Sequence, residues 1–349
     1  MSGLEVFIEA LVKVIVAFAV ALTIVLLLVW AERRVVAFMQ NRLGPTRAGP
    51  WGILQTLADG MKLMFKEALT PRRAEVGLYL AAPVLALVPA LLIFLAIPFG
   101  APITVGDNTY TLQGTDLNVG VLYVLALSSI AVYAITLAGW SSGSKYPLLG
   151  SVRASAQMIS YEAAMGLALI PVVMFTGTLS LAGIVEAQGE TFFGFLPAWN
   201  IVLIPSFIVF LISAFAETNR APFDLVEAEQ ELVGGFHTEY SGFRFALFFL
   251  AEYLNMFNMA ALTVVFFLGG WQGPVFGPTV LQWILPVVWF FLKTFVIIFL
   301  FIWARGTLPR LRYDQLMAFG WKKLIPVSLA WILLAMVAMG VRRFGWPWV

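Results

Sequence analysis

The sequence contains no cysteine and only one histidine, His237, among its 349 residues. The absence of cysteine excludes disulfides, a cysteine-ligated iron–sulfur cluster and a thiol nucleophile. A single histidine also argues against a bis-histidine haem or a multi-histidine metal site. We therefore expect His237 to form local hydrogen bonds. If the protein takes part in redox chemistry, a partner has to carry the electrons.

Charged residues are also scarce, at 11% of the chain, whereas soluble domains contain about 25%. Hydrophobic residues make up 61%, and the mean hydropathy is +0.92. This composition is typical of an integral membrane protein. Eight apolar runs lack an alternation of period two, so they predict an all-α protein with about eight transmembrane helices rather than a barrel. The runs cover residues 6–30, 77–98, 119–140, 157–178, 201–216, 243–268, 284–304 and 325–341.

The basic residues are distributed unevenly among the segments that connect these runs. Seventeen of the 21 lie in or beside four segments, and the three alternating segments contain none. By the positive-inside rule, the four basic segments are cytoplasmic and both termini lie outside. We expect one polytopic domain over residues 1–349. The cytoplasmic segments are about 31–76, 141–156, 217–242 and 305–324.

The third cytoplasmic segment concentrates acidic residues beside apolar runs. Closely spaced carboxylates cannot all ionise cheaply, so their titrations are expected to be coupled, and Arg220 offers a counter-charge. The segment is either a solvated loop that docks a basic partner or part of a proton-linked, conformationally switching site, and we favour the second. It holds six of the 19 acidic residues, namely Glu217, Asp224, Glu227, Glu229, Glu231 and Glu239.

The first cytoplasmic segment combines basic, amide and aromatic residues with two Gly-Pro turns, at Gly44-Pro45 and Gly49-Pro50. Residues 53–66 follow with the pattern of an amphipathic helix that lies flat on the membrane surface. Positive charge here either anchors the protein to the membrane or lines the pocket of a lipid-soluble ligand. Both interpretations fit the residues.

Four charged residues fall inside the apolar runs: Lys13, Glu162, Glu252 and Lys293. Each costs about 2.5–3.5 kcal/mol at a lipid-facing centre, so we expect them to face the bundle interior. A polar path through the membrane is our default hypothesis, and structural pairing is the alternative.

Four stretches at or beside the predicted cytoplasmic segments carry a family resemblance. They read ERRVVAFMQNRLGPTRAGPWGILQTLADGMKLMFKE (32–67), GWSSGSKYPLLGSVRASAQMISYE (139–162), AETNRAPFDLVEAEQELVGGFHTEYSGFRFALFFLAEY (216–253) and RGTLPRLRYDQLMAFGWKKLIP (305–326). With them, nearly the whole chain resembles the quinone-site membrane subunit of respiratory complex I, the proton-pumping NADH:quinone oxidoreductase. In bacteria it is known as the H subunit. Gly143 and Pro147 depart from the residues expected there, and neither position carries charge.

The resemblance implies that the cytoplasmic loops, together with two peripheral subunits, enclose a quinone chamber and couple quinone reduction to proton translocation. It implies quinone as the substrate, with FMN, iron–sulfur clusters and NADH on partner subunits and no cofactor on this chain. The expected partners are the other membrane-arm and peripheral-arm subunits and membrane lipids, with no nucleic acid. Glu32, Arg33, Gln40, Asp59 and Arg305 are the implied chamber residues. Glu162, Glu217, Asp224, Glu227, Glu229 and Glu231 form the implied acidic path, with Arg220 as their counter-charge.

Three rival functions stay open from the sequence. The nearest is the equivalent subunit of an energy-converting hydrogenase or of a complex fed by ferredoxin or F420. A stand-alone proton-coupled carrier predicts inverted repeats and broken helices, which the sequence does not show. A plain membrane anchor does not require the charges inside the apolar runs.

Overall fold

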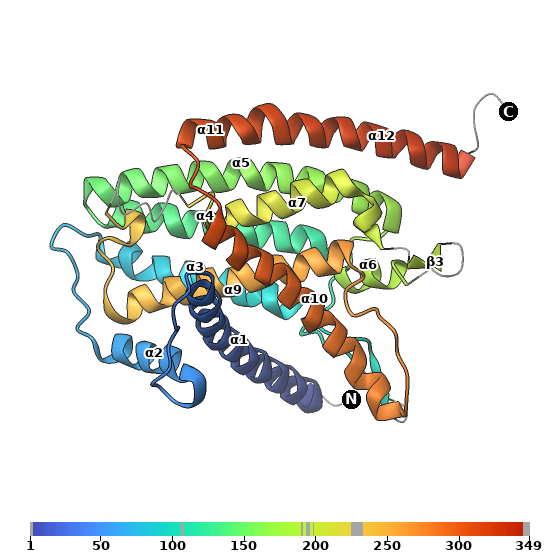
Figure 1. Ribbon diagram of the computed structural model, residues 1–349, viewed down its shortest axis with the longest axis horizontal. Coiled ribbons are helices and arrows are strands. Elements are labelled where there is room, and N and C mark those ends of the chain that lie inside the picture. Colours follow the sequence, from blue (N-terminus) through green and yellow to red (C-terminus); the bar gives the residue numbers. More distant parts are fainter. Residues whose placement is uncertain are drawn as a thin grey trace.

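The computed structural model describes residues 3–105, 108–189, 191–192, 196–197, 199–224 and 233–344, and these residues are almost entirely helical (Figure 1). Seven helical stretches in this part are long and apolar enough to cross a membrane, which confirms the all-α membrane fold. They are α1 (Gly3–Met39), α3 (Val76–Ala96), α4 (Gly120–Ser141), α5 (Lys145–Thr176), α9 (Gly242–Phe267), α10 (Thr279–Thr307), and the continuous stretch of α11 (Tyr313–Phe319), a π-helical turn (Gly320–Leu324) and α12 (Ile325–Phe344).

The eighth expected span, at 201–216, is a shorter helix. Here α7 covers only Ile204–Glu217 and follows a 3-10 turn at Asn200–Val202. At 1.5 Å per residue its 14 residues extend about 21 Å, less than the roughly 30 Å of a bilayer core. Pro205 suits the first turn because proline has no N–H to donate there, and Asn219 turns the chain beyond the helix with a φ of 50°.

Several boundaries differ from the expected loops because helices continue beyond the apolar runs. Helix α1 has 37 residues and a length of about 55 Å, so its last third extends past one bilayer thickness and contains Glu32 and Arg33. Most of the expected loop at 141–156 belongs to α5, which begins at Lys145. The expected loop at 305–324 contains α11 and the π-helical turn.

The expected amphipathic helix is present as α2 (Gln55–Phe65). Its apolar side chains Met61, Met64 and Phe65 are exposed. An exposed apolar face beside a membrane-spanning bundle fits a helix that lies in the membrane surface.

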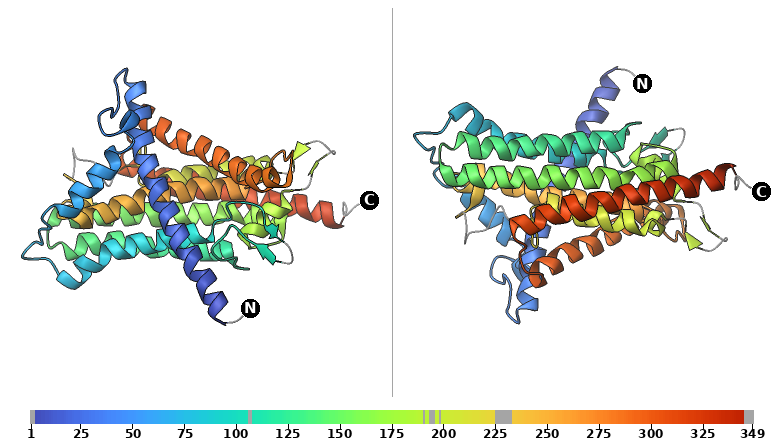
Figure 2. Two further views of the ribbon diagram at one scale, coloured as in Figure 1. Left: turned by 90° about the horizontal axis from the view of Figure 1, so that it is seen from below. Right: turned by 90° about the horizontal axis from the view of Figure 1, so that it is seen from above.

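Helix α9 is the centre of the bundle. Every residue from Met256 to Phe267 is buried, and the helix contacts α1, α3, α7 and α10. In Figure 1, α3, α4, α5, α7 and α9 run roughly parallel, and α12 lies along α5. Figure 2 shows α1 and α10 inclined to this group.

The start of α1 and the end of α12 lie toward one end of the bundle, and α2 lies at the other (Figure 1). The short hairpins also lie toward the chain ends, where β1 (Ile103–Val105) pairs antiparallel with β2 (Asn108–Tyr110) and β3 (Thr191–Phe192) pairs with β4 (Leu196–Pro197). This arrangement agrees with the expectation that both termini share one side. Which side faces the cytoplasm stays a prediction.

Candidate functional site

A cleft of about 760 Å³ opens at the α2 end of the bundle, between α1, α9 and α10. It brings together four of the five residues predicted for the quinone chamber. Arg42 Nε donates to Gln40 Oε1 at 2.7 Å, so the amide of Gln40 is held at the wall. The cleft is lined by Glu32, Arg33, Val36, Gln40, Arg42, Gly44, Pro45, Gln55, Phe249, Tyr253, Arg305 and Gly306.

The fifth predicted residue, Asp59, joins the cleft through its partners. Arg33 Nη1 lies 2.6 Å from Asp59 Oδ2, and Gln55 Nε2 donates to Asp59 Oδ1 at 3.2 Å. Asp59 therefore contacts two residues of the cleft wall, and through Arg33 it links α2 to α1.

The turn before α2 is tied to α1. Trp30 Nε1 and Arg34 Nη1 both donate to the carbonyl oxygen of Trp51, at 3.0 and 2.8 Å. The next residue, Gly52, has a φ of 75°, and a Cβ there would lie 2.2 Å from the carbonyl oxygen of Pro45. Only glycine fits this close approach to Pro45, and Gly44 and Pro45 line the cleft.

A buried ionic cluster lies behind the cleft. The Glu32 carboxylate accepts hydrogen bonds from both Arg220 and Arg305. The Nη2 atom of Arg220 lies 3.1 Å from Glu252 Oε1, and its guanidinium stacks over the Tyr253 ring at 4.3 Å. Burial opposes the charge of Arg220, but Glu32 and Glu252 outweigh it and raise the pKa of Arg220 above its ordinary value. Arg220 thus stays charged although it is only 3% exposed, and two acids on different helices share its guanidinium.

These ion pairs differ from the expected role of Arg220 as counter-charge to the acidic stretch. The described pairs of Arg220 join it to α1 and α9, because the chain turns at Asn219 directly after α7. Asp224 instead pairs with Arg310 Nη2 at 2.9 Å. Glu227, Glu229 and Glu231 lie outside the described residues.

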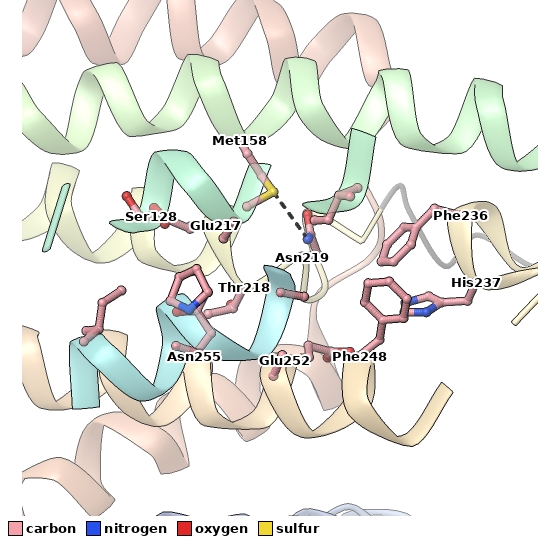
Figure 3. Close-up of a pocket in the computed structure, with 17 residues that line it drawn as sticks. Ser128, Met158, Glu217, Thr218, Asn219, Phe236, His237, Phe248, Glu252 and Asn255 are labelled. Atoms are coloured by element: carbon pink, nitrogen blue, oxygen red, sulfur yellow. Dashed lines mark hydrogen bonds between the residues drawn. The ribbon is translucent and has the colours of Figure 1, made fainter. Parts of the chain in front are cut away.

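An internal cavity of about 60 Å³ lies on the far side of the cluster (Figure 3). It has room for about four waters, since one water needs roughly 10–15 Å³ by the same measure. Glu252 and Asn255 of α9, Glu217 of α7 and Ser128 of α4 line it. The side chain of Glu217 is buried, and its Oε2 has no hydrogen-bond partner in the described part of the chain.

The cavity leads on to Glu162 on α5. Ser128 Oγ donates to Glu162 Oε1 at 3.0 Å, and Ser129 donates to the same oxygen. Polar groups therefore connect the cleft to the bundle interior, in the order Glu32, Arg220, Glu252, the cavity with Glu217 and Ser128, and Glu162.

Two of the four charges predicted inside the membrane, Glu162 and Glu252, lie on this route. Lys293 does not. Its Nζ donates to the carbonyl oxygens of Leu268, Gly270 and Gln272, at 2.7, 3.1 and 2.6 Å, and lies 4.2 Å from the Trp199 ring. It therefore caps the end of α9 that is far from the cluster. Lys13 lines a separate cavity of about 320 Å³.

His237 lies in an aromatic environment rather than in the hydrogen-bonding role expected for it. Its ring centroid is 3.7 Å from that of Phe236 and 5.4 Å from that of Phe248, and its Nδ1 is buried without a hydrogen-bond partner in the described part of the chain. Burial lowers the pKa of His237 to about 3. The side chain also lines the internal cavity and is neutral at physiological pH.

Prediction from residue types alone did not identify three residues of this route, namely Glu252, Ser128 and Asn255. Glu252 was noted as a charge inside an apolar run but was not assigned to the acidic path. Its position within that run could have indicated that it belongs to the path. Ser128 and Asn255 carry no charge, so they resemble the many small polar residues of membrane helices. Only the cavity that they line distinguishes them.

These features define a polytopic helical membrane protein in which a buried charged cluster separates a surface cleft from an internal cavity. Residues 12–336 match the NADH dehydrogenase family, and the chain belongs to that family. It is 55% identical over 326 residues to the H subunit of NADH-quinone oxidoreductase from Frankia alni, covering 93% of this chain and 71% of the relative. It is 51% identical over 348 residues to the second H-type subunit of that enzyme from Koribacter versatilis, covering 95% and 97%. It is 54% identical over 324 residues to the first H-type subunit from Geobacter metallireducens, covering 93% and 94%.

Proposed function

We propose that this chain forms part of the quinone-binding chamber of a proton-translocating NADH:quinone oxidoreductase and couples quinone reduction to proton translocation. The observation that carries the proposal is the position of Arg220. It pairs with Glu32 at the cleft and with Glu252 at the internal cavity, so one buried cation is shared by both.

The cleft suits a polar aromatic headgroup. Its volume of about 760 Å³ falls within the usual range for ligand sites, about 300–1,000 Å³. Arg33, Gln40 and Arg305 supply donors for quinone oxygens, and Phe249 and Tyr253 supply ring faces. In this proposal the chamber is completed by peripheral-arm subunits. Those subunits carry the NADH site, FMN and iron–sulfur clusters. The clusters have to lie there because this chain has no cysteine to hold one.

Coupling follows from the shared cation. Reduction makes the quinone oxygens more negative and creates a demand for protons beside Arg305 and Glu32. A change of charge there alters how strongly Arg220 attracts Glu252, because both acids compete for the same guanidinium. The effect reaches the cavity that contains Glu217 and, through Ser128, Glu162.

The remaining acids of the proposed path are Asp224, Glu227, Glu229 and Glu231. Asp224 is bound to Arg310 at the start of the acidic stretch, so it is held close to the base of α10. The other three acids, Glu227, Glu229 and Glu231, follow Asp224 in the chain. The whole chain then acts as one polytopic domain of a bacterial inner membrane, with both termini on the outer side and contacts to the other membrane-arm subunits and to lipids.

The experiment uses the assembled complex in sealed proteoliposomes with NADH and a short-chain quinone. Glu252→Gln keeps the shape of the side chain and removes its charge, so we expect the initial rate of proton uptake to fall about tenfold or more. The matched control is Glu186→Gln, which changes an exposed glutamate of α6 (Leu181–Ala187) near the chain ends and is expected to leave the rate unchanged. An unaltered rate and an unaltered number of protons per NADH in a normally assembled Glu252→Gln complex would remove Glu252 and the shared cation from the coupling route.

A further inference from the structure

A second large opening lies outside the proposed chamber, between α7, α10 and α11. This groove has a volume of about 640 Å³. Its walls are mainly apolar, and two adjacent lysines, Lys322 and Lys323, line it as well. The apolar part includes Ile212, Phe215, Phe223, Ala304, Leu308 and Leu311.

The two lysines line the same groove although they are neighbours in the chain. In a regular α-helix, consecutive side chains point about 100° apart, since one turn takes 3.6 residues. Here the backbone forms a π-helical turn from Gly320 to Leu324, and such turns are frequent at functional sites.

The backbone that carries the lysines is fixed by contacts with α5. Trp321 Nε1 donates to Ser160 Oγ at 3.0 Å, and the Tyr161 hydroxyl donates to the Leu316 carbonyl oxygen at 3.0 Å. A Cβ on Gly320 would lie 3.6 Å from the Tyr161 ring, so the turn lies close to α5.

The floor of the groove is also anchored. Pro222 and Phe223 line it, and the Leu311 N–H donates to the Pro222 carbonyl oxygen at 3.1 Å. One residue further on, Asp224 pairs with Arg310. The groove is thus a preformed site, and its floor is the first part of the acidic stretch.

The charge of the groove identifies the class of ligand. Among the described residues its lining contains two cations and no aspartate or glutamate, and no ion pair in the described part of the chain involves Lys322 or Lys323. Both side chains and Leu308 are exposed, so the groove opens on the outer surface of the bundle. Arg33 and Arg305 of the cleft are paired with acids, whereas the two ammonium groups of this groove have no acid in its described lining, and a phosphate beside them would neutralise their charge.

We propose that this groove binds one anionic phospholipid, with its phosphate at Lys322 and Lys323 and an acyl chain along Phe215, Ala304 and Leu308. Lysine stems pack on apolar surface while their ammonium groups reach the headgroup level of a membrane, which is the arrangement here. Because the lipid covers Phe223, it braces the segment that ends in the Asp224–Arg310 pair.

The test labels the site directly in the purified, assembled complex. The complex is placed in phosphatidylcholine vesicles that contain a trace of phosphatidylglycerol with a photoreactive diazirine on its acyl chain, and labelled peptides are mapped by mass spectrometry. A phosphatidylcholine probe with the same acyl chain is the matched control. We expect the anionic probe to label the α7 and α10 residues of the groove, unlabelled phosphatidylglycerol to compete, and the zwitterionic probe to label them weakly.

The variant Lys322→Gln/Lys323→Gln should reduce this labelling about 30-fold, which corresponds to about 1 kcal/mol for each of two lysines near an anionic lipid surface. Lys62→Gln/Lys66→Gln, which removes two exposed lysines at the C-terminal end of α2, is expected to leave the label in the groove unchanged. If the glutamine pair prevents assembly, Ala304→Trp fills the groove, keeps both lysines and should abolish the label.

Four results overturn the proposal. The first is equal labelling by the two lipid probes in the unaltered complex, and the second is labelling that survives the loss of both lysines. The third is competition by a quinone analogue but not by phosphatidylglycerol, which would show a quinone in the groove. The fourth is the absence of label in the groove, which would show that another subunit covers it. None of these outcomes depends on the rate of quinone reduction.

Discussion

The buried pair between Arg220 and Glu252 allows a quantitative test. The perturbations are Arg220→Gln, Glu252→Gln and both together. Arg220→Gln removes the cation beside Glu252, whereas Glu32 keeps Arg305, so we expect a loss of about 3 kcal/mol in the free energy of unfolding. Glu252→Gln should cost less, about 1–2 kcal/mol, because Glu32 continues to neutralise Arg220.

The coupling energy between the two residues follows from their distance. Unit charges 3.1 Å apart attract by about 5 kcal/mol at an effective dielectric constant of about 20. The Glu252 side chain is 20% exposed, so solvent screens part of this attraction. We expect a coupling of about 2 kcal/mol, with the double variant more stable than the sum of the single effects predicts.

The assay is equilibrium unfolding of the purified chain in mixed detergent micelles, followed by the fluorescence of its 12 tryptophans. The same cycle on Arg33→Gln and Asp59→Asn is the control. That pair is closer, at 2.6 Å, but its side chains are 45% and 28% exposed, so the expected coupling is below about 1 kcal/mol. Effects of the Arg220 and Glu252 variants that add to within about 0.5 kcal/mol would show that the buried cation is not shared.

Two further predictions concern the cleft and His237. Arg33→Ala should raise the KM for quinone about tenfold with little change in kcat, since a hydrogen bond to a charged donor contributes about 1.5 kcal/mol or more. Steady-state kinetics measure this effect, and Arg47→Ala, which changes an exposed arginine, is the control. An unchanged KM in Arg33→Ala would exclude Arg33 from quinone binding. Burial lowers the pKa of His237 to about 3. Between pH 6.5 and 3 the unfolded chain therefore binds more protons at this residue than the folded chain does. The free energy of unfolding then decreases as the pH is lowered, by up to about 1.4 kcal/mol per pH unit. His237→Phe should remove this contribution in unfolding measured at pH 7 and pH 5, and an identical loss in both proteins contradicts it.

Composition and periodicity were sufficient for the all-α membrane fold and for α2, because both depend on local patterns of apolar residues. Helix ends were less predictable. Charged residues such as Glu32 and Arg33 mark the end of the apolar run, but they are good helix formers, and α1 continues through them to Met39. For α7 the apolar run at 201–216 already indicated a short element, and Pro205 in the first turn and the turn at Asn219 bound the helix at Ile204 and Glu217.

The candidate site was predicted in part. The family resemblance named Glu32, Arg33, Gln40 and Arg305, and the structure brings them into one cleft. The partner of Arg220 could not be read from the sequence, because Glu32 lies 188 positions away and nearer acids were equally available. Long-range pairs depend on which helices touch, and the bundle decides that by packing its apolar faces rather than by its charges.

Lys293 has a mechanical consequence for helices α9 and α10. By bonding three carbonyl oxygens after α9, it fastens α10 to the far end of α9. Away from Lys293, α9 carries Glu252 in its interior and α10 carries Arg305 in its last turn, and among the described ion pairs these two are joined through Arg220 and Glu32. Lys293 therefore joins the two helices at one place, and the cluster of Glu32 and Arg220 joins them at a second. A change of charge in the cluster would act on two helices whose spacing is already fixed at the Lys293 end.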